Sequence, residues 1–369
     1  MSKFYKDVAH QLNHFHPHKV YVAMSGGGQS FAYHYLKYSG ASNSIAGIRI
    51  PYGRKDFVNF IGRTPSQFVC EDTARLMAIS SYKACLEEVD ETVAVGIGVT
   101  CSLATDDERI GREHKMYLAI HNYEYTMVYS IILKQGLTRD QEEDFCCLWI
   151  FKMLNNLINH PVAADDDLNQ LCNIITTTAP YITTFECKRA NRADFDTEIP
   201  EDATEVVIAP GSWDPAHEGH FGVIKLAGEI LGIKPYIELT TKNADKGIID
   251  YLEVEKRLGN LKEFNKLLTS ATTFLEKARL LARPYRTIYF VVGTDTWNRI
   301  LDPKYAGDMF SLYDLFVQMN AKFLVVNRES APMLSHVVMD ELLIKDDRLN
   351  SFNIAISSTE IRKQQAESA

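Results

Sequence analysis

The chain has 369 residues, of which 46% are hydrophobic and 24% are charged. This composition is that of folded globular protein and excludes a long disordered tail, while the length exceeds what one hydrophobic core usually holds. The formal net charge of -9 excludes a general electrostatic attraction to nucleic acid or to an anionic membrane. We therefore expect two globular domains, with any phosphate ligand held at a local basic site.

The N-terminal residues 1–19 are polar and rich in histidine, where a signal peptide needs an apolar stretch, and no run of about 18 apolar residues follows. We expect no membrane contact and a cytoplasmic location. Seven cysteines are an odd number without Cys-x-x-Cys spacing, which favours free thiols over disulfides or structural zinc. His14, His16 and His18 lack converging partners and are interpreted as a solvated helix end.

The first half alternates between the patterns of strands and helices. Apolar runs predict strands at residues 19–24, 44–50, 92–99 and 114–120, and helical spacing predicts helices at 30–38, 70–88 and 139–159. Pro161 disfavours helix in the residue before it, so the last helix should end there. The alternation predicts an α/β domain over residues 1–160.

The segment that follows changes in composition. It contains three consecutive aspartates at 165–167 and a charged run at 188–202. We expect a linker over residues 161–202, with a short helix at 168–175 left open.

The remaining chain repeats the alternation with buried-strand patterns. Short apolar runs predict strands at residues 205–209, 235–239, 287–292, 322–327 and 353–356, and helical stretches fill the gaps. We expect a second α/β domain over 203–369, a doubly wound parallel sheet of the Rossmann-like kind.

One motif of this second domain lies directly between its first strand and the following helix. Residues 211–220 read Gly-Ser-Trp-Asp-Pro-Ala-His-Glu-Gly-His. A helix N-terminus presents unpaired N–H groups and partial positive charge, which favour an anion. His217 and His220 share one helical face and can donate to the same phosphates, while Gly219 allows close approach. The motif predicts a triphosphate site.

A second motif, residues 356–362, also follows a predicted strand and opens a helix. Ser357, Ser358 and Thr359 are good N-cap residues, and Arg362 adds a cation. Nucleotidyl transfer needs charge stabilisation on the phosphates and in-line positioning more than covalent help from the protein. These residue types suit that chemistry.

Together the two motifs resemble the HxGH nucleotidyltransferase superfamily, and the Ile-Ser-Ser-Thr-Glu-Ile-Arg form most resembles its nicotinamide/nicotinate mononucleotide adenylyltransferases. Between them, Gly293-Thr-Asp-Thr-Trp297 is similar to the family turn that shapes the nucleotide site, and Arg328 to a basic residue after the next strand. The resemblance implies adenylylation of the mononucleotide by ATP with Mg2+, a nucleotidyltransferase fold, and pyrophosphate release.

The resemblance also implies roles for particular residues. His217, His220 and Arg362 would be catalytic. Nucleotide-binding residues would be Gly211, Ser212, Trp213, Gly219, Gly293, Asp295, Trp297, Arg328, Ser357, Ser358 and Thr359. Lys242 or Lys246, after the second strand, would be the cation for the substrate phosphate. No residue is expected to bind a metal directly.

The glycine-rich turn of the first half carries another resemblance. Residues 24–28 read Met-Ser-Gly-Gly-Gly, which resembles the start of the CinA C-terminal domain, the nicotinamide-nucleotide amidase family. Ser25 falls on the family nucleophile, and Tyr52 and Thr100 match two later positions. The family lysine is replaced by Phe57, so only Lys55 offers a nearby amine.

A serine nucleophile needs a base or cation to ionise its hydroxyl. We therefore expect a degenerate amidase-like domain kept for ligand binding, assembly or regulation, unless Lys55 reaches Ser25. The leading hypothesis for the whole chain is adenylylation of nicotinamide or nicotinate mononucleotide in NAD biosynthesis. The alternatives are a cytidylyltransferase-type enzyme with another phosphorylated acceptor and a non-catalytic pyridine-nucleotide sensor. A homo-oligomer through the apolar helix at 145–158 stays open.

Overall fold

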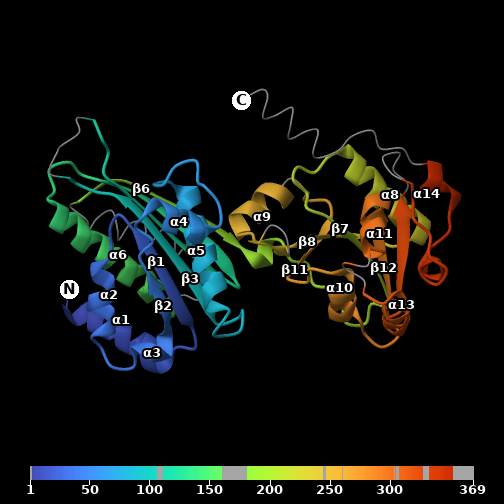
Figure 1. Cartoon of the computed structure of the whole chain (residues 1–369), viewed down its shortest axis with the longest axis horizontal. Coiled ribbons are helices and arrows are strands. Elements are labelled where there is room, and N and C mark those ends of the chain that lie inside the picture. Colours follow the sequence, from blue (N-terminus) through green and yellow to red (C-terminus); the bar gives the residue numbers. More distant parts are fainter. Residues whose placement is uncertain are drawn as a thin grey trace. The chain divides into compact units, whose positions relative to one another are not determined.

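The structure is a computed structural model that describes residues 2–105, 111–159, 181–243, 247–259, 261–302, 304, 307–326 and 332–351. The chain forms two compact units (Figure 1). Unit 1 comprises Met1–Arg192 and Asp250–Leu252, and unit 2 comprises Ala193–Ile249 and Glu253–Ala369. Both units are α/β, as the sequence predicts.

Unit 1 is built from a six-stranded sheet with helices on both faces. Its helices are α1 (Ser2–Phe15), α2 (Ser30–Leu36), α3 (Ala41–Ser44), α4 (Arg54–Ile61), α5 (Glu71–Cys85) and α6 (Arg139–Asn159). Its strands are β1 (Lys19–Ser25), β2 (Ile45–Arg49), β3 (Ala94–Ser102), β4 (Lys115–Asn122), β5 (Tyr125–Leu133) and β6 (Ile182–Asn191).

The sheet of unit 1 is mixed, in the order β2-β1-β3-β4-β5-β6. β1 pairs in parallel with β2 and β3, and the remaining neighbours pair antiparallel. Apolar side chains of α1, α2 and α6 cover one face, while α4 and α5 pack against the other. The buried apolar residues of α6 therefore belong to the core of unit 1.

The linker expected at residues 161–202 is corrected in its second half. Residues Ile182–Asn191 form β6, which pairs with β5, and unit 1 continues to Arg192. The strand lies at the sheet edge, where residues such as Glu186 and Lys188 are exposed in alternation with half-buried neighbours. Charged residues therefore marked the outer face of an edge strand.

Unit 2 has a five-stranded sheet and a small two-stranded one. The strands are β7 (Glu205–Pro210), β8 (Tyr236–Thr240), β9 (Lys242–Asn243), β10 (Gly247–Ile248), β11 (Asn265–Thr269), β12 (Thr287–Gly293) and β13 (Ala321–Val326). The helices are α8 (Glu218–Leu231), α9 (Tyr251–Leu258), α10 (Phe274–Leu281), α11 (Thr294–Ile300), α13 (Met309–Gln318) and α14 (Asp347–Ser351), with 3-10 helices η1 (Arg192–Asp194) and η2 (Met339–Leu342).

The larger sheet of unit 2 is parallel throughout, in the order β11-β8-β7-β12-β13. The order reverses between β7 and β12, which is the topological switch point of a doubly wound fold. α10, α11 and α13 pack against one face through a common apolar core. The fold confirms the expected class. Ligands of open parallel sheets bind outside the carboxyl ends of the strands at such a switch point, which predicts a candidate crevice beyond Pro210 and Gly293.

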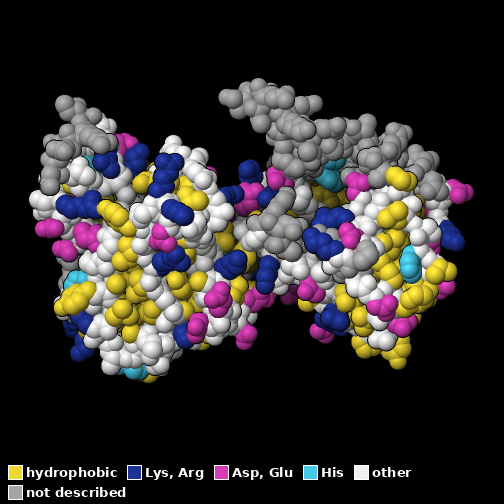
Figure 2. Space-filling view, in the orientation of Figure 1, with side chains coloured by type: hydrophobic (Ala, Val, Ile, Leu, Met, Phe, Trp, Pro, Cys, Tyr) yellow, Lys and Arg dark blue, Asp and Glu magenta, His cyan; other side chains and the backbone are white. Residues whose placement is uncertain are grey.

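The surface shown in Figure 2 mixes charges of both signs over the described parts of the two units. Lys and Arg side chains are interspersed with Asp and Glu side chains in this view. Within the described ranges, no helix combines the length and apolar composition that crossing a membrane requires.

His121 of β4 is a titratable group in the core of unit 1. It is buried, its Nδ1 lies 2.7 Å from Thr126 Oγ1, and the Tyr82 ring packs edge-on against it. Burial lowers the pKa of His121 to about 4; the Asp250 carboxylate acts to raise this pKa and the Arg75 guanidinium to lower it. The folded protein therefore keeps this imidazole neutral.

We predict that acidification destabilises unit 1 through His121. Between its unfolded pKa of 6.5 and its folded pKa of about 4, the unfolded chain binds a proton that the folded state excludes. The free energy of unfolding should fall by up to about 3 kcal/mol as pH drops through this window, and His121 should contribute no pH dependence above it. Urea unfolding at several pH values should give a shallower pH slope for His121→Gln than for the parent, whereas exposed His10→Gln should match the parent. Equal slopes in all three proteins would contradict the assignment.

Candidate functional site

The turn between β7 and α8 brings together the histidines of the first predicted motif. His217 is the N-cap of α8 and has an extended backbone, and His220 lies in the first turn. The two imidazole rings stack with centroids 3.8 Å apart and planes inclined by 26°. The His217 amide donates to His220 Nδ1 at 3.3 Å. Two rings with N–H donors thus lie together at a helix N-terminus, where backbone dipoles favour an anion.

Trp213 supports this pair from within the turn. Its indole is buried, its Nε1 donates to the Glu238 carbonyl at 2.9 Å, and its ring packs edge-on against His220 at 5.1 Å. The Gly211 amide donates to the same carbonyl at 3.0 Å. Trp213 has a φ of 51°, a left-handed conformation that costs a non-glycine residue about 1–2 kcal/mol. The buried contacts of the indole offset this strain.

Arg257 of α9 fixes the middle of the turn. Its Nη1 donates to the Ser212 carbonyl at 3.2 Å, and its Nε donates to Glu253 Oε1 at 2.8 Å. The predicted residues Gly211, Ser212 and Trp213 therefore lie in one anchored turn beside the histidines, and their contacts here are made through backbone groups and a buried ring.

The turn after β12 lies at the same edge of the sheet, because β7 and β12 are parallel neighbours. Gly293 ends β12, and Asp295 is exposed in the first turn of α11. Trp297 is 0% exposed, donates from Nε1 to the Leu334 carbonyl at 3.1 Å and packs on Phe323. The structure therefore gives Trp297 a packing role and leaves Asp295 as the accessible side chain of this turn.

Several expected site residues lie outside the described residues, namely Lys246, Arg328, Ser357, Ser358, Thr359 and Arg362. Gly219 lies in the first turn of α8, between the two histidines. Lys242 is exposed on β9, two residues beyond the end of β8. Its placement leaves the ammonium accessible from solvent.

Sequence reasoning missed a buried ion pair behind the turn. Lys277 of α10 donates to Glu238 of β8 at 2.7 Å, and the two residues are 4% and 1% exposed. A glutamate in the otherwise apolar run 235–239, and a lysine on the apolar side of the helix 274–281, were the signals that could have found it. Charged residues are almost never fully buried unless they are paired.

In unit 1, Ser25 ends β1 opposite Thr100 of β3. Thr100 is buried and donates to the Phe68 carbonyl at 2.7 Å, so its hydroxyl is already engaged. Tyr52 is 74% exposed and Lys55 is exposed on α4. Within the described residues, no hydrogen bond or ion pair joins Ser25 to Tyr52 or Lys55. The structure thus assembles no base beside this serine from those residues.

The first turn of α6 fills the space that the glycine turn encloses. Glu143 accepts hydrogen bonds from the Gly28 and Ser30 amides at 2.7 and 2.9 Å. Arg139 donates to the Gly26 carbonyl at 2.9 Å. A carboxylate of the protein itself therefore holds the amides that could otherwise bind a phosphate or an oxyanion. No residue spacing along the chain links α6 to this turn.

Glu142, next to Glu143 in the sequence, is fully buried and makes two polar contacts of its own. Its Oε2 accepts from the Ala104 amide at 2.6 Å, and its Oε1 lies 2.5 Å from His114 Nδ1. This pair fixes the loop that follows β3. In the described part of the chain, no group of three or more His, Cys, Asp or Glu residues could hold a metal ion.

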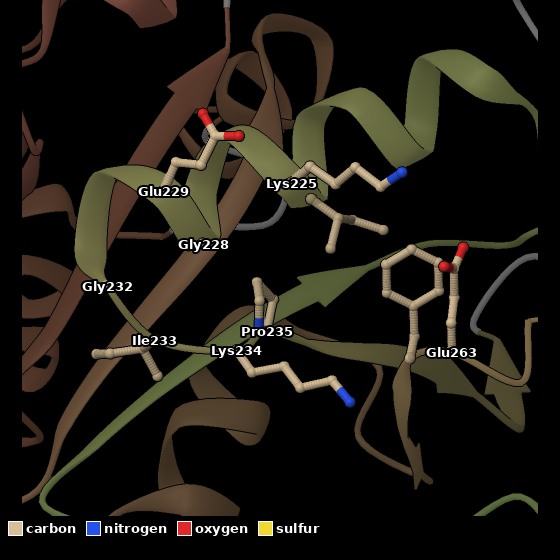
Figure 3. Close-up of a pocket in the computed structure, with 10 residues that line it drawn as sticks. Lys225, Gly228, Glu229, Gly232, Ile233, Lys234, Pro235 and Glu263 are labelled. Atoms are coloured by element: carbon tan, nitrogen blue, oxygen red, sulfur yellow. The ribbon is translucent and has the colours of Figure 1, made fainter.

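A cavity of about 490 Å³ lies on unit 2, between the C-terminal half of α8 and the start of β8 (Figure 3). Lys225, Glu229 and Lys234 contribute charged side chains to it. It lies at the opposite end of α8 from His217, because α8 begins at the carboxyl edge of β7 and returns to the amino end of β8. This cavity is therefore separate from the carboxyl edge of the sheet, where His217 and His220 lie.

Unit 2 thus combines a parallel sheet with a histidine pair at its switch point. Residues 208–364 match the family model described as Cytidylyltransferase-like. The match contains both motifs and confirms the resemblance of the second half to HxGH nucleotidyltransferases. A search of curated protein sequences gave no match.

Solved structures that are similar to the chain are of two kinds. The competence/damage inducible protein CihA of Agrobacterium tumefaciens is 14% identical, with 42% of this chain and 93% of that chain covered and a TM-score of 0.34. A CinA superfamily protein of Klebsiella pneumoniae is 12% identical, with 43% and 98% covered and a TM-score of 0.35. The nicotinic acid mononucleotide adenylyltransferase of Plasmodium falciparum is 18% identical, with 43% and 82% covered and a TM-score of 0.29.

We predict that Gly26 is required by the packing of the turn in unit 1. A Cβ added there would lie 2.1 Å from the Cys101 carbonyl oxygen, at a φ of 82°. Gly26→Ala should therefore lower the free energy of unfolding of unit 1 by about 2–5 kcal/mol, from left-handed strain and overpacking together. Gly62→Ala is the matched control, because Gly62 has a φ of 76° and open space around it. It should cost only about 1–2 kcal/mol in the same urea titration. Equal losses would show that crowding by Cys101 is unimportant.

Proposed function

We propose that unit 2 transfers the adenylyl group of ATP to nicotinamide or nicotinate mononucleotide and releases pyrophosphate. The observation that carries the proposal is the stacked pair His217 and His220 at the N-terminus of α8, at the switch point of a parallel sheet. This segment also lies within the residues that match the Cytidylyltransferase-like family.

In the proposed reaction, a phosphate oxygen of the acceptor attacks the α-phosphorus of ATP, and the bond to the pyrophosphate oxygen breaks. Negative charge grows on the phosphoryl oxygens and on the leaving group as the reaction proceeds. The imidazoles of His217 and His220, with the N-terminal dipole of α8, would stabilise this charge. Ser358, Thr359 and Arg362, within the matched segment, are proposed to bind the β- and γ-phosphates.

Mg2+ is proposed to arrive on the triphosphate, where it neutralises charge. Proteins usually hold this ion through one or two carboxylates together with substrate phosphates, so a preformed cluster of ligands is not needed. Asp295 is exposed at the carboxyl edge of β12. We propose it as one such carboxylate, which departs from the expectation that no residue binds the metal directly. The donor set at this edge therefore fits a substrate-borne ion.

The choice of acceptor is supported by motifs in both halves of the chain. The sequence Ser-Ser-Thr-Glu-Ile-Arg at 357–362 resembles the corresponding motif of pyridine mononucleotide adenylyltransferases. The turn at 24–28 resembles that of an amidase family that acts on nicotinamide mononucleotide. One shared metabolite would explain both. A cytidylyl donor with another phosphorylated acceptor is the second candidate, because the matched family is described as Cytidylyltransferase-like.

Pyrophosphate release tests the proposed reaction directly. The purified chain with Mg2+ should release pyrophosphate with ATP and either mononucleotide, and should do so much more slowly with CTP or with phosphocholine or glycerol phosphate as the acceptor. Release with CTP alone would favour the cytidylyl alternative. A chain that binds these nucleotides without any release would instead favour the sensor.

His220→Ala should lower the rate of pyrophosphate release by at least about 100-fold, since one preorganised donor to transition-state charge contributes a factor of about 100–1,000. His10→Ala, at an exposed position of α1, is the control and should leave the rate unchanged. A His220→Ala protein with the parent rate would remove the histidine pair from the mechanism.

We also propose that unit 1 is an amidase-like domain without hydrolase activity, kept for binding, assembly or regulation. Support comes from the exposed positions of Tyr52 and Lys55 and from Glu143, which occupies the amides of Gly28 and Ser30. A carboxylate at those two amides occupies donors that an oxyanion would otherwise use.

The parent chain should release no ammonia above background from nicotinamide mononucleotide. Ser25→Ala should therefore give the same background result. The pyrophosphate assay should also give the parent rate. Ammonia release by the parent that Ser25→Ala abolishes would restore the amidase assignment.

A further inference from the structure

A buried network lies behind the candidate crevice of unit 2, and Lys277 is its centre. An ammonium group has three N–H donors. Lys277 Nζ donates to Glu238 Oε1 at 2.7 Å, to Thr240 Oγ1 at 2.5 Å and to the Ala271 carbonyl at 2.9 Å. All three donors are thus engaged, by the middle of β8, by the last residue of β8 and by the loop after β11.

Glu238 gathers further hydrogen bonds on the same carboxylate oxygen. Thr240 Oγ1 lies 2.9 Å from Glu238 Oε1, and Thr269 Oγ1, at the end of β11, donates to it at 2.5 Å. Glu238 Oε2 is buried and has no hydrogen-bond partner among the described residues. The network therefore joins the carboxyl ends of two neighbouring strands through one carboxylate and one ammonium.

Stability alone does not account for this arrangement. Burying an ion pair carries a desolvation cost that apolar side chains of similar volume avoid, so an apolar pair would often stabilise the fold as well or better. A charged network of this kind is directional, however, and it fixes the atoms that it joins more closely than apolar packing does. Its effect is to hold strand ends in register with each other.

The same glutamate contacts the phosphate side of the crevice through its backbone. The Glu238 carbonyl accepts hydrogen bonds from Trp213 Nε1 and the Gly211 amide, and Trp213 packs against His220. The side chain of Glu238 faces the ends of β8 and β11, and its carbonyl holds the histidine turn. Glu238 therefore lies where the two sides of the crevice meet.

The strand order indicates which substrate lies on which side. The triphosphate is proposed at the N-terminus of α8, beside the switch point between β7 and β12. In-line attack requires the acceptor to approach the α-phosphorus from the side opposite the leaving pyrophosphate. The strand ends that remain on the other side of β7 are those of β8 and β11, which the Lys277 network joins.

We infer that Lys277 is a positioning residue for the acceptor substrate of unit 2, acting through Glu238, Thr240 and the loop after β11. This inference rests on the proposed nucleotidyl transfer and adds to it the residues that shape the acceptor side. Loss of the network lets the ends of β8 and β11 relax, which misplaces the acceptor relative to the α-phosphorus. A displacement of about 1 Å can cost about 100-fold in rate.

The test compares steady-state kinetics of the full chain with each substrate varied in turn. Lys277→Met keeps the length of the side chain and removes its donors. It should raise KM for the mononucleotide, or lower kcat/KM for it, by about 10- to 100-fold, while KM for ATP stays within about twofold. Lys322→Met is the matched control, because Lys322 is half-buried on β13 at the far edge of the same sheet. It should change neither constant.

A second variant allows the same test if Lys277→Met alone does not fold. Lys277→Met combined with Glu238→Gln removes both charges and keeps acceptors for Thr240 and Thr269, so it should fold even where the single variant does not. The inference requires the defect in the mononucleotide constants to persist in this double variant. Parent-like constants for both substrates, or equal changes in both, would overturn it.

Calorimetric binding of the mononucleotide, in the presence of a non-hydrolysable ATP analogue, gives the same comparison without turnover. A parent that binds the mononucleotide but releases no pyrophosphate would refute the proposed reaction. The inference would then stand if the double variant binds at least about 10-fold more weakly, and fall if it binds as the parent does. A parent that shows neither binding nor turnover would overturn both.

Discussion

The parallel pairing of β7 with β8 on one side and β12 on the other is the interaction on which unit 2 depends. Strands β8 and β11 are added on one side of β7, and strands β12 and β13 on the other. The turns after β7 and β12 therefore lie next to each other at one edge of the sheet. A helix that begins there presents its positive end to the crevice. His217 and His220 owe their place beside a candidate phosphate site to this pairing.

Glutamates secure the turn after the first strand in both units, and they do so with opposite consequences. In unit 2 the Glu238 carbonyl holds Gly211 and Trp213 from behind, so the turn is anchored on its sheet side. In unit 1 the Glu143 carboxylate holds Gly28 and Ser30 from within the turn. The first arrangement supports an anion site, whereas the second already contains an anion.

The buried hydrogen-bonded pairs of the two units also differ in what they connect. Glu142 and His114 tie the loop after β3 to α6 in unit 1, at the edge where Ser25 lies. Lys277 and Glu238 tie the ends of β8 and β11 in unit 2. Hydrogen-bonded side-chain pairs at the carboxyl edge of a sheet hold loops that apolar packing alone leaves free to adjust. The proposed nucleotidyl transfer would depend on such a preorganised edge, because it has to position two substrates.

The amino-acid sequence by itself determined the α/β class, most strands, and the histidine motif, because these are set by local periodicity and by residue types at a strand-to-helix turn. Tertiary structure alone decided the rest. The edge strand β6 was hidden by its charged outer face, and Trp297 proved to be a core residue although its motif suggests a nucleotide contact. Glu143 contacts a turn 115 residues away in the sequence, and Lys277 contacts a strand 39 residues away. No local pattern encodes such contacts, since they arise only when the helices pack on their sheets.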